Sequence, residues 1–376
     1  MIYLDNNAST PIDPAVREAM LPYLEKYFGN PSSSHSMGRP GKEAVQRARK
    51  QVADMLGAAP DEIIFTSGGT ESNNHVIKGA ACTRQDRGRH IITTAIEHPA
   101  VTHPCRFLER FGCEVTYVGV DSTGMVDPEA VVDAIRPDTI LISVMHANNE
   151  VGTIQPIAEI AAAAKQAGVW MHTDAAQSCG KIATRVVELG VDFLSLAGHK
   201  IYGPKGIGAL YIRKGIELEP LHHGAGHEGG RRAGTEPVAS IVGLGVAAKR
   251  VIAEAGNHEQ IRAMRDRLHD GLTQSLGDDA VLLGHPQRRL PNTLSIGFRG
   301  RIGGEVLAGC PDICASTGAA CHSGHRKRSA VLEAMNVPEE IAFGAVRFSL
   351  GRFTTEAEID QALLMLVNAL AGSLKS

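Results

Sequence analysis

Short apolar runs alternate with amphipathic stretches along this chain up to about residue 250. Helical patterns lie between the apolar runs, and residues 156–167 form one of them, with proline at the first turn and glycine after the end. This alternation is typical of a doubly wound α/β domain around a parallel sheet. The runs that predict strands are 62–65, 90–93, 114–120, 140–145, 169–174, 191–196 and 208–213.

The pattern changes after about residue 250. A long amphipathic helix is predicted at 258–276, followed by a strand at 292–298, a glycine-rich loop and a final helix. Thr355 and Glu358 have the spacing of a capping box for that last helix. We therefore expect a second, smaller α+β domain. The predicted division is 1–15 for an N-terminal arm that joins the small domain, 16–250 for the large domain and 251–376 for the small domain.

Composition narrows the possible functions. A net charge of −3 produces no basic field that would favour nucleic acid. Residues 1–7 do not resemble a signal segment, and no apolar stretch is long enough to cross a bilayer. The seven cysteines are scattered, without paired metal-ligand spacing, which favours free thiols in a reducing compartment. We expect a cytoplasmic protein that binds neither nucleic acid nor membrane and holds no metal.

Two charged residues stand at the ends of predicted buried strands. Asp174 closes the strand 169–174, and Lys200 follows the strand 191–196. A buried charge is costly without a partner, and the carboxyl ends of parallel strands usually line a ligand crevice. Pyridoxal phosphate suits such a pair, because the lysine forms a Schiff base and the acid keeps the ring nitrogen protonated. An interior salt bridge is the other interpretation, and these two residues alone do not separate the two.

A glycine loop lies between the strand 62–65 and the next helix. Gly68 and Gly69 let the backbone approach an anion, and the helix start presents free N–H groups and a positive dipole end. The hydroxyl of Thr70 adds a further donor. An ordinary helix cap is the alternative for this loop taken by itself.

Three polar residues follow other predicted strands. The imidazole of His98 suits stacking on a pyridine ring and moving protons, although a lone histidine is more often structural. Asn149 follows the strand 140–145, and Gln177 lies three residues past Asp174. Either amide suits a hydrogen bond to a phenolic oxygen.

Two more candidates lie in the C-terminal part. Cys321 stands in a loop of small and polar residues, which predicts an exposed thiol. Arg347 has the geometry to clamp a carboxylate with two hydrogen bonds, and an ion pair that stabilises the fold is its alternative role.

Taken in order, these motifs resemble the cysteine desulfurases, a branch of the fold-type I, class V aminotransferase-like enzymes that use pyridoxal phosphate. The resemblance runs from residues 3–8 to residues 347–352. Its most specific part is Ser195-Leu196-Ala197-Gly198-His199-Lys200. Residues 231–236 look most like the nitrogen-fixation (NifS) and housekeeping iron–sulfur (IscS) subgroups.

The resemblance implies roles around the cofactor ring. Lys200 would form the Schiff base, Asp174 would hold the pyridine nitrogen, and His98 would stack on the ring as a catalytic residue. Gln177 and Asn149 would lie near the ring oxygen O3′.

The resemblance also implies how the phosphate is bound. Gly69, Thr70 and His199 would bind it within one chain, and Thr235 would reach the phosphate of the neighbouring subunit. The enzyme would therefore be a homodimer. Many family members have a serine where this chain has Ala197, so one phosphate hydrogen bond is absent or comes from another donor.

The implied reaction converts L-cysteine to L-alanine. Asn149 and Arg347 would bind the substrate, and Cys321 would take its sulfur as a persulfide. The sulfur would pass to an acceptor or scaffold protein for iron–sulfur clusters or another sulfur-containing cofactor. The form Gly-Ala-Ala-Cys-His-Ser at 318–323 is similar to that of selenocysteine lyases, which makes L-selenocysteine the alternative substrate. Cys314 has no clear family counterpart.

Two other functional classes fit the same fold. An aminotransferase needs no thiol, so Cys321 argues against one. A non-catalytic sulfur-assembly scaffold would not need the complete set of Lys200, Asp174 and Cys321.

Overall fold

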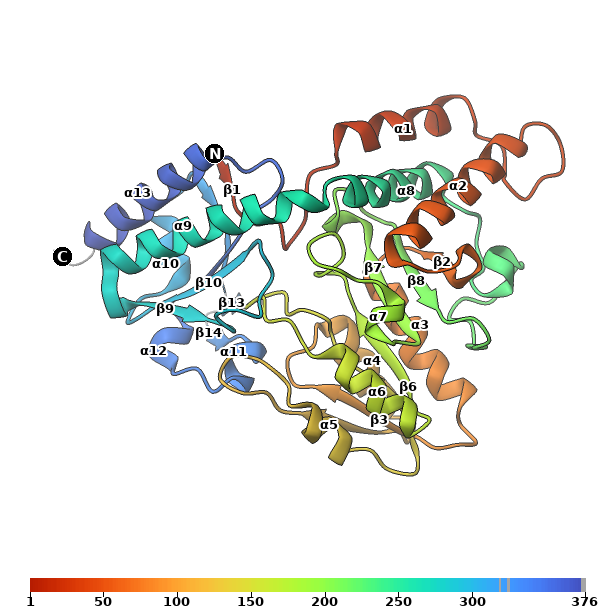
Figure 1. Cartoon of the computed structure of the whole chain (residues 1–376), viewed down its shortest axis with the longest axis horizontal. Coiled ribbons are helices and arrows are strands. Elements are labelled where there is room, and N and C mark those ends of the chain that lie inside the picture. The colour runs from red at the N-terminus through yellow and green to blue at the C-terminus, as the bar shows by residue number, and fades with distance from the viewer. Residues whose placement is uncertain (318, 323–324, 373–376) are drawn as a thin grey trace.

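The computed structural model describes residues 1–317, 319–322 and 325–372, with backbone alone at residues 255, 319–322, 325–327 and 372. Figure 1 shows two lobes, the larger around a central sheet and the smaller built from both ends of the chain. No helix of the described ranges is both long and apolar enough to cross a membrane.

The large lobe contains one seven-stranded sheet in the order β2-β8-β7-β6-β5-β3-β4. Each strand predicted for this domain is present, with ends shifted by at most two residues. The strands are β2 (Ile63–Thr66), β3 (His90–Thr94), β4 (Glu114–Val118), β5 (Thr139–Ser143), β6 (Trp170–Asp174), β7 (Phe193–Ala197) and β8 (Gly208–Ile212).

The direction of β8 departs from the predicted parallel sheet. It pairs antiparallel with both β7 and β2, whereas β3, β4, β5, β6 and β7 pair in parallel. The connection from β7 to β8 contains only the short 3-10 helix η2 (Gly198–Lys200), and a parallel neighbour would need a longer crossover. The sheet is therefore mixed, with the reversed strand between β2 and β7.

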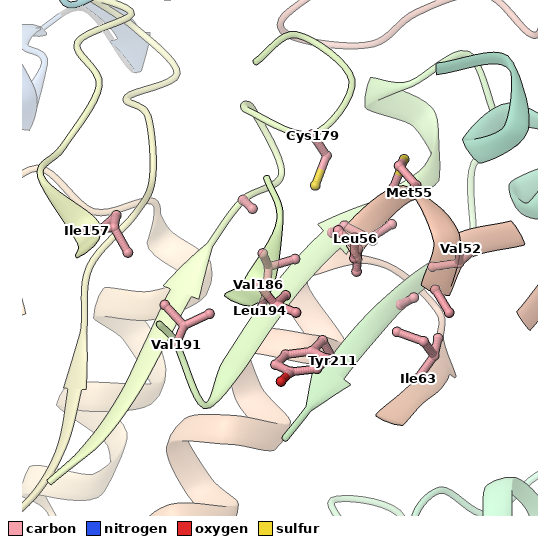
Figure 2. Close-up of a cluster of buried hydrophobic side chains, with 14 of the residues drawn as sticks. Val52, Met55, Leu56, Ile63, Ile157, Cys179, Val186, Val191, Leu194 and Tyr211 are labelled. Atoms are coloured by element: carbon pink, nitrogen blue, oxygen red, sulfur yellow. The ribbon is translucent and has the colours of Figure 1, made fainter. Parts of the chain in front are cut away.

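Helices cover both faces of this sheet. Ile63 and Phe65 of β2 belong to one buried cluster and Ile64 to another, as alternation along a strand requires. The first cluster contains residues of α2 (Arg39–Leu56), α6 (Ile157–Gln166) and α8 (Val238–Ala253), and Figure 2 shows part of it. The second contains residues of α3 (Gly69–Thr83) and α4 (Pro99–Glu109). The doubly wound architecture is confirmed.

The small lobe contains an antiparallel sheet in the order β12-β15-β10-β9. Its strands are β9 (Ala280–Leu283), β10 (Thr293–Phe298), β12 (Ser316–Thr317) and β15 (Ala345–Ser349), and helices α9 (His258–Leu276) and α13 (Glu356–Gly372) pack on it. The predicted capping box is confirmed, because the Thr355 amide donates to Glu358 at 2.8 Å and the Glu358 amide donates back to the Thr355 hydroxyl at 3.3 Å.

The N-terminal arm runs along the small sheet before it enters the large lobe. Strand β1 (Ile2–Tyr3) pairs in parallel with β11 (Ile313–Cys314), and the backbone of Asp5 forms an isolated parallel β-bridge with that of Ser349. The Thr10 amide then donates to the His199 carbonyl at 2.9 Å. The boundary near residue 250 stays a prediction; it falls close to where α8, in the large core, gives way to α9, in the small one.

The remaining elements are short or peripheral. They are α1 (Pro14–Glu25), α5 (Pro128–Asp133), α7 (Val186–Leu189), α10 (Gly303–Ala308), α11 (Ala330–Ala334), α12 (Glu339–Ala342), β13 (Ala319–His322) and β14 (His325–Arg328).

Leu56 tests the packing of α2 on the large sheet. Its side chain is fully buried, so Leu56→Ala should lower the free energy of unfolding by about 2–5 kcal/mol. Urea denaturation measures this loss. The control Leu364→Ala removes the same atoms from a side chain that is 62% exposed and should cost less than about 1 kcal/mol. Equal losses in both variants would contradict this account of the core.

Candidate active site

A cavity of about 310 Å³ opens beside the carboxyl ends of β5, β6 and β7 and the first turns of α3 and α4. It brings together most of the residues predicted to bind a cofactor. Those that line it are Gly69, Thr70, His98, Asn149, Asp174, Gln177, His199 and Lys200. Asn73 and Ala197 also line it.

The start of α3 forms one end of this cavity. No side chain caps the helix at Gly68, so the reading of an ordinary capped helix is not supported. Gly68 has a φ of 150°, which side-chain-bearing residues avoid. A β-carbon on Gly208 would lie 2.7 Å from the Gly68 Cα, so a glycine is required at position 208, where β8 passes the loop. The uncapped backbone amides at the start of α3, together with Gly69, Thr70 and His199, are suited to binding a phosphate group.

Asp174 is held by two donors. Its Oδ1 accepts a hydrogen bond from the Ala176 amide at 2.9 Å, and its Oδ2 accepts one from Asn73 Nδ2 at 2.6 Å. Asn73 was not predicted from the sequence, although its place one helical turn after Gly69 puts it on the same side of α3. Its Oδ1 is buried without a partner among the described residues, which fits a donor from a bound molecule.

Lys200 does not form an ion pair with Asp174 in the described part of the chain. Its Nζ instead donates to the backbone carbonyls of Asn7 and, at 2.9 Å, Ala8. Burial, and then the nearby Arg347 guanidinium, lower the pKa of Lys200 to about 8. A useful fraction of the amine is therefore neutral and nucleophilic just above neutral pH.

His98 is the N-cap residue of α4. Its Nδ1 accepts a hydrogen bond from the Ala100 amide at 3.0 Å, so the neutral ring carries its proton on Nε2. Burial lowers the pKa of His98 below its ordinary value, with Lys200 adding to the effect. The ring is therefore a neutral donor at Nε2, and Nδ1 would have to give up the helix cap before it could act as a base.

A buried network fixes the amide of Gln177. Lys181 Nζ donates to Gln177 Oε1 at 3.0 Å and to Asn7 Oδ1 at 3.2 Å. The other end of the amide, Nε2, donates to the Asn7 carbonyl at 2.9 Å. Burial, followed by the nearby charge of Lys200, holds the pKa of Lys181 well below its usual range. Sequence reasoning did not identify Lys181, because its position in a turn has no periodic signal.

Arg347 stands beside the cavity rather than in its lining. Its Nη1 donates to the Asn149 carbonyl at 2.9 Å, and its Nη2 donates to Asp5 Oδ1 at 2.7 Å and to the Ser316 hydroxyl at 3.0 Å. The predicted alternative, an ion pair within the fold, is thus present. Nε is buried without a partner among the described residues, so one guanidinium donor remains for a carboxylate.

Two predicted site residues remain, Thr235 and Cys321. Thr235 is exposed and does not line the cavity. Its segment is tied to α3 and α2 by ion pairs between Arg232 and Glu71 at 2.9 Å and between Arg49 and Glu228 at 2.6 Å. The side chain of Cys321 lies outside the part that the structure describes. The backbone around it, predicted as a loop, pairs as strands β13 and β14.

Cys314 lies on the arm side of the small lobe. It is partly buried in β11 and is the register partner of Tyr3 in β1. This pairing within a strand fits a packed structural residue better than a reactive thiol.

Comparison with known proteins identifies the family. The sequence model of Aminotransferase class-V matches residues 2–362, and the chain belongs to this family. It is 50% identical over 366 residues to "Cysteine desulfurase IscS" of Methanosarcina thermophila, covering 96% of this chain and 90% of that relative.

Solved structures agree with this assignment. The structure of a "NIFS-LIKE PROTEIN" superimposes with a TM-score of 0.92 at 40% identity and covers 98% of this chain and 99% of its own. That of "SspA in complex with cysteine" has a TM-score of 0.82 at 39% identity, covering 94% of this chain and 100% of its own.

The lowered pKa of Lys200 predicts its reactivity. Its amine should react with a small aldehyde increasingly as pH rises through about 8, because deprotonation makes it nucleophilic. Borohydride trapping followed by peptide mass spectrometry measures the modified fraction. Modification that was already complete at pH 6, or that began only above pH 10, would contradict the effect of burial and Arg347.

Proposed function

We propose that this chain is a pyridoxal 5′-phosphate-dependent cysteine desulfurase that converts L-cysteine to L-alanine and transfers the sulfur to Cys321. One observation carries the proposal: Asp174 and Lys200 line the same cavity as the uncapped start of α3. Membership of the Aminotransferase class-V family and similarity to IscS cysteine desulfurases over nearly the whole chain support it.

The residues around the cavity fit this cofactor. Gly69, Thr70 and His199 would hold the phosphate, Asp174 would hold the proton on the pyridine nitrogen, and Lys200 would bind the cofactor covalently. When bound, pyridoxal phosphate stores the electrons released at the α-carbon of the substrate. The unsatisfied acceptor of Asn73 and the free amides of α3 are the structural features that support the fit.

Side chains of this protein would then carry out the proton transfers and bind the substrate carboxylate. Lys200, with a pKa of about 8, would take the α-proton as a neutral amine and later return it. His98 has its Nδ1 engaged by Ala100, which leaves Lys200 as the better base. Arg347 would bind the substrate carboxylate through the guanidinium donor that its contacts with Asp5 and Asn149 leave free.

Cys321 would act as a thiolate, because the thiol is a poor nucleophile. Attack on the substrate sulfur forms an S–S bond while the Cβ–S bond breaks, and the carbon skeleton leaves as L-alanine. The sulfur of the resulting persulfide would pass to an acceptor or scaffold protein, for iron–sulfur clusters or another sulfur-containing cofactor. The similarity to IscS proteins supports that route. The free cysteines of the described part support a cytoplasmic location.

Two variants test the proposal. Lys200→Ala should lose alanine release from L-cysteine, because the covalent link and the base are removed together.

Cys321→Ala should abolish sulfur release from L-cysteine while sparing part of the selenium release from L-selenocysteine, since selenium leaves more readily. Steady-state kinetics on both substrates measure this. Full cysteine turnover by Cys321→Ala would remove Cys321 from the mechanism, and wild-type activity on selenocysteine alone would identify a selenocysteine lyase.

We also infer a homodimer. The exposure of Thr235, in a segment held by the Glu71–Arg232 and Arg49–Glu228 ion pairs, supports a role for its hydroxyl in the site of a second chain.

Light scattering should therefore give the mass of a dimer. Thr235→Ala should remain a dimer but bind pyridoxal phosphate less tightly, because one hydroxyl donor to the partner's phosphate is lost. A hydrogen bond to a charged group contributes about 1.5–3 kcal/mol, so the dissociation constant should rise roughly ten- to hundredfold. A fully active monomer would be incompatible with a shared site.

A further inference from the structure

Two serines flank the segment that carries Cys321, and each is hydrogen-bonded to a carboxylate. Ser316, in β12, donates to Asp5 Oδ1 at 2.8 Å. Ser329, just before α11, donates to Glu150 Oε2. Both serines that flank the segment of Cys321 are therefore held by hydrogen bonds to other parts of the chain.

The first attachment is continuous with the proposed substrate clamp. Ser316 is the register partner of Arg347 in the antiparallel pair β12–β15. Arg347 Nη2 also donates to the Ser316 hydroxyl at 3.0 Å and to Asp5 at 2.7 Å. Ser316, Asp5 and Arg347 are thus hydrogen-bonded to one another pairwise. Ser316 therefore cannot shift without breaking its hydrogen bonds to the Asp5 carboxylate and the Arg347 guanidinium.

The second attachment reaches the loop that carries Asn149. As the N-cap of α11, the Ser329 hydroxyl accepts a hydrogen bond from the Val331 amide at 3.1 Å. The same hydroxyl donates a hydrogen bond to the Glu150 carboxyl group. The Glu150 amide donates at 2.8 Å to Asn148 Oδ1, which holds the loop in place. Burial raises the pKa of Glu150, so its carboxyl group is a neutral acceptor over more of the pH range than an exposed glutamate.

Both attachments converge on one part of the site. Arg347 Nη1 donates to the Asn149 carbonyl at 2.9 Å, and Asn149 directly precedes Glu150 in the chain. The residues that would bind the substrate therefore also support the two ends of the nucleophile segment. A thiolate that must reach a single sulfur atom depends on such support, since a misplacement of about 1 Å can cost roughly a hundredfold in rate.

We propose that Ser316 and Ser329, held by Asp5 and Glu150, are positioning residues that set the place of Cys321 for sulfur transfer. This inference rests on the proposed function, in which Cys321 is the nucleophile. Sulfur transfer alone should depend on these bonds, because cofactor binding and α-proton removal use other residues.

Ser329 allows a matched pair of variants. Ser329→Asn keeps an acceptor for the helix cap and a donor for Glu150, whereas Ser329→Asp keeps the cap but has no donor and brings a second carboxyl group to Glu150. Ser329→Asp should lower kcat for alanine release from L-cysteine at least about tenfold, and Ser329→Asn should stay within about threefold of wild type. The KM for L-cysteine and the affinity for pyridoxal phosphate should change little in either variant.

Glu150 provides a second pair. Glu150→Gln keeps a neutral acceptor and should behave like wild type, whereas Glu150→Leu should show the kinetic defect of Ser329→Asp. L-selenocysteine serves as the comparison substrate, because its turnover depends less on Cys321 and should be spared.

Hydrogen–deuterium exchange of the cofactor-free protein gives a readout that does not depend on activity. Amide exchange in the peptide 316–329 should rise in Ser329→Asp and Glu150→Leu and should match wild type in Ser329→Asn and Glu150→Gln. Unchanged exchange in Ser329→Asp, or equal losses on cysteine and selenocysteine, would overturn the positioning role. A wild-type protein without desulfurase activity would overturn the proposed function instead, and the exchange experiment would still decide whether the attachments exist.

Discussion

Asn7, a buried residue of the N-terminal arm, forms hydrogen bonds to both lobes. Its carbonyl accepts from Lys200 and Gln177 in the large lobe, while its side chain donates at 2.9 Å to Thr293 and accepts at 3.1 Å from Asn292 in the small one. Because an unsatisfied amide at this depth would cost about 1–3 kcal/mol, these bonds fix how the sheets face each other. The cavity and the position of Arg347 depend on that relation.

Burial without a matched counter-ion sets much of the chemistry around the cavity. The pKa of Lys200 is lowered to about 8, that of His98 is lowered, and that of Glu150 is raised, each chiefly because the charged form is desolvated. A neutral amine and a neutral imidazole are what a site needs if protons are to move at ordinary pH. The strong charge of Arg347 stays paired with Asp5.

Much of the large lobe could be predicted from the sequence, because apolar runs of five or six residues have few alternatives to a buried strand. The reversal of β8 could not, since strand direction depends on the connection after Lys200 and not on the strand's own residues. In the small lobe, β15 was not predicted, because a strand interrupted by Arg347 lacks an unbroken apolar run. Asp174 and Lys200 were identifiable from strand ends. Asn73 and Lys181 were not, since polar residues in helices and turns are usually exposed.

The pair formed by Glu71 and Arg232 affects how the protein responds to acid. Burial alone would raise the pKa of Glu71, but hydrogen bonds from Arg232 and Ser67 lower it from 4.5 to about 2. A depressed pKa of this kind contributes stability that is complete above the ordinary value and is lost only as pH falls through about 2. The segment with Thr235 is tied through this pair to α3, whose first turn lines the cavity. In acid, this link should therefore hold until the pH approaches 2, and the segment should stay attached to α3 until then.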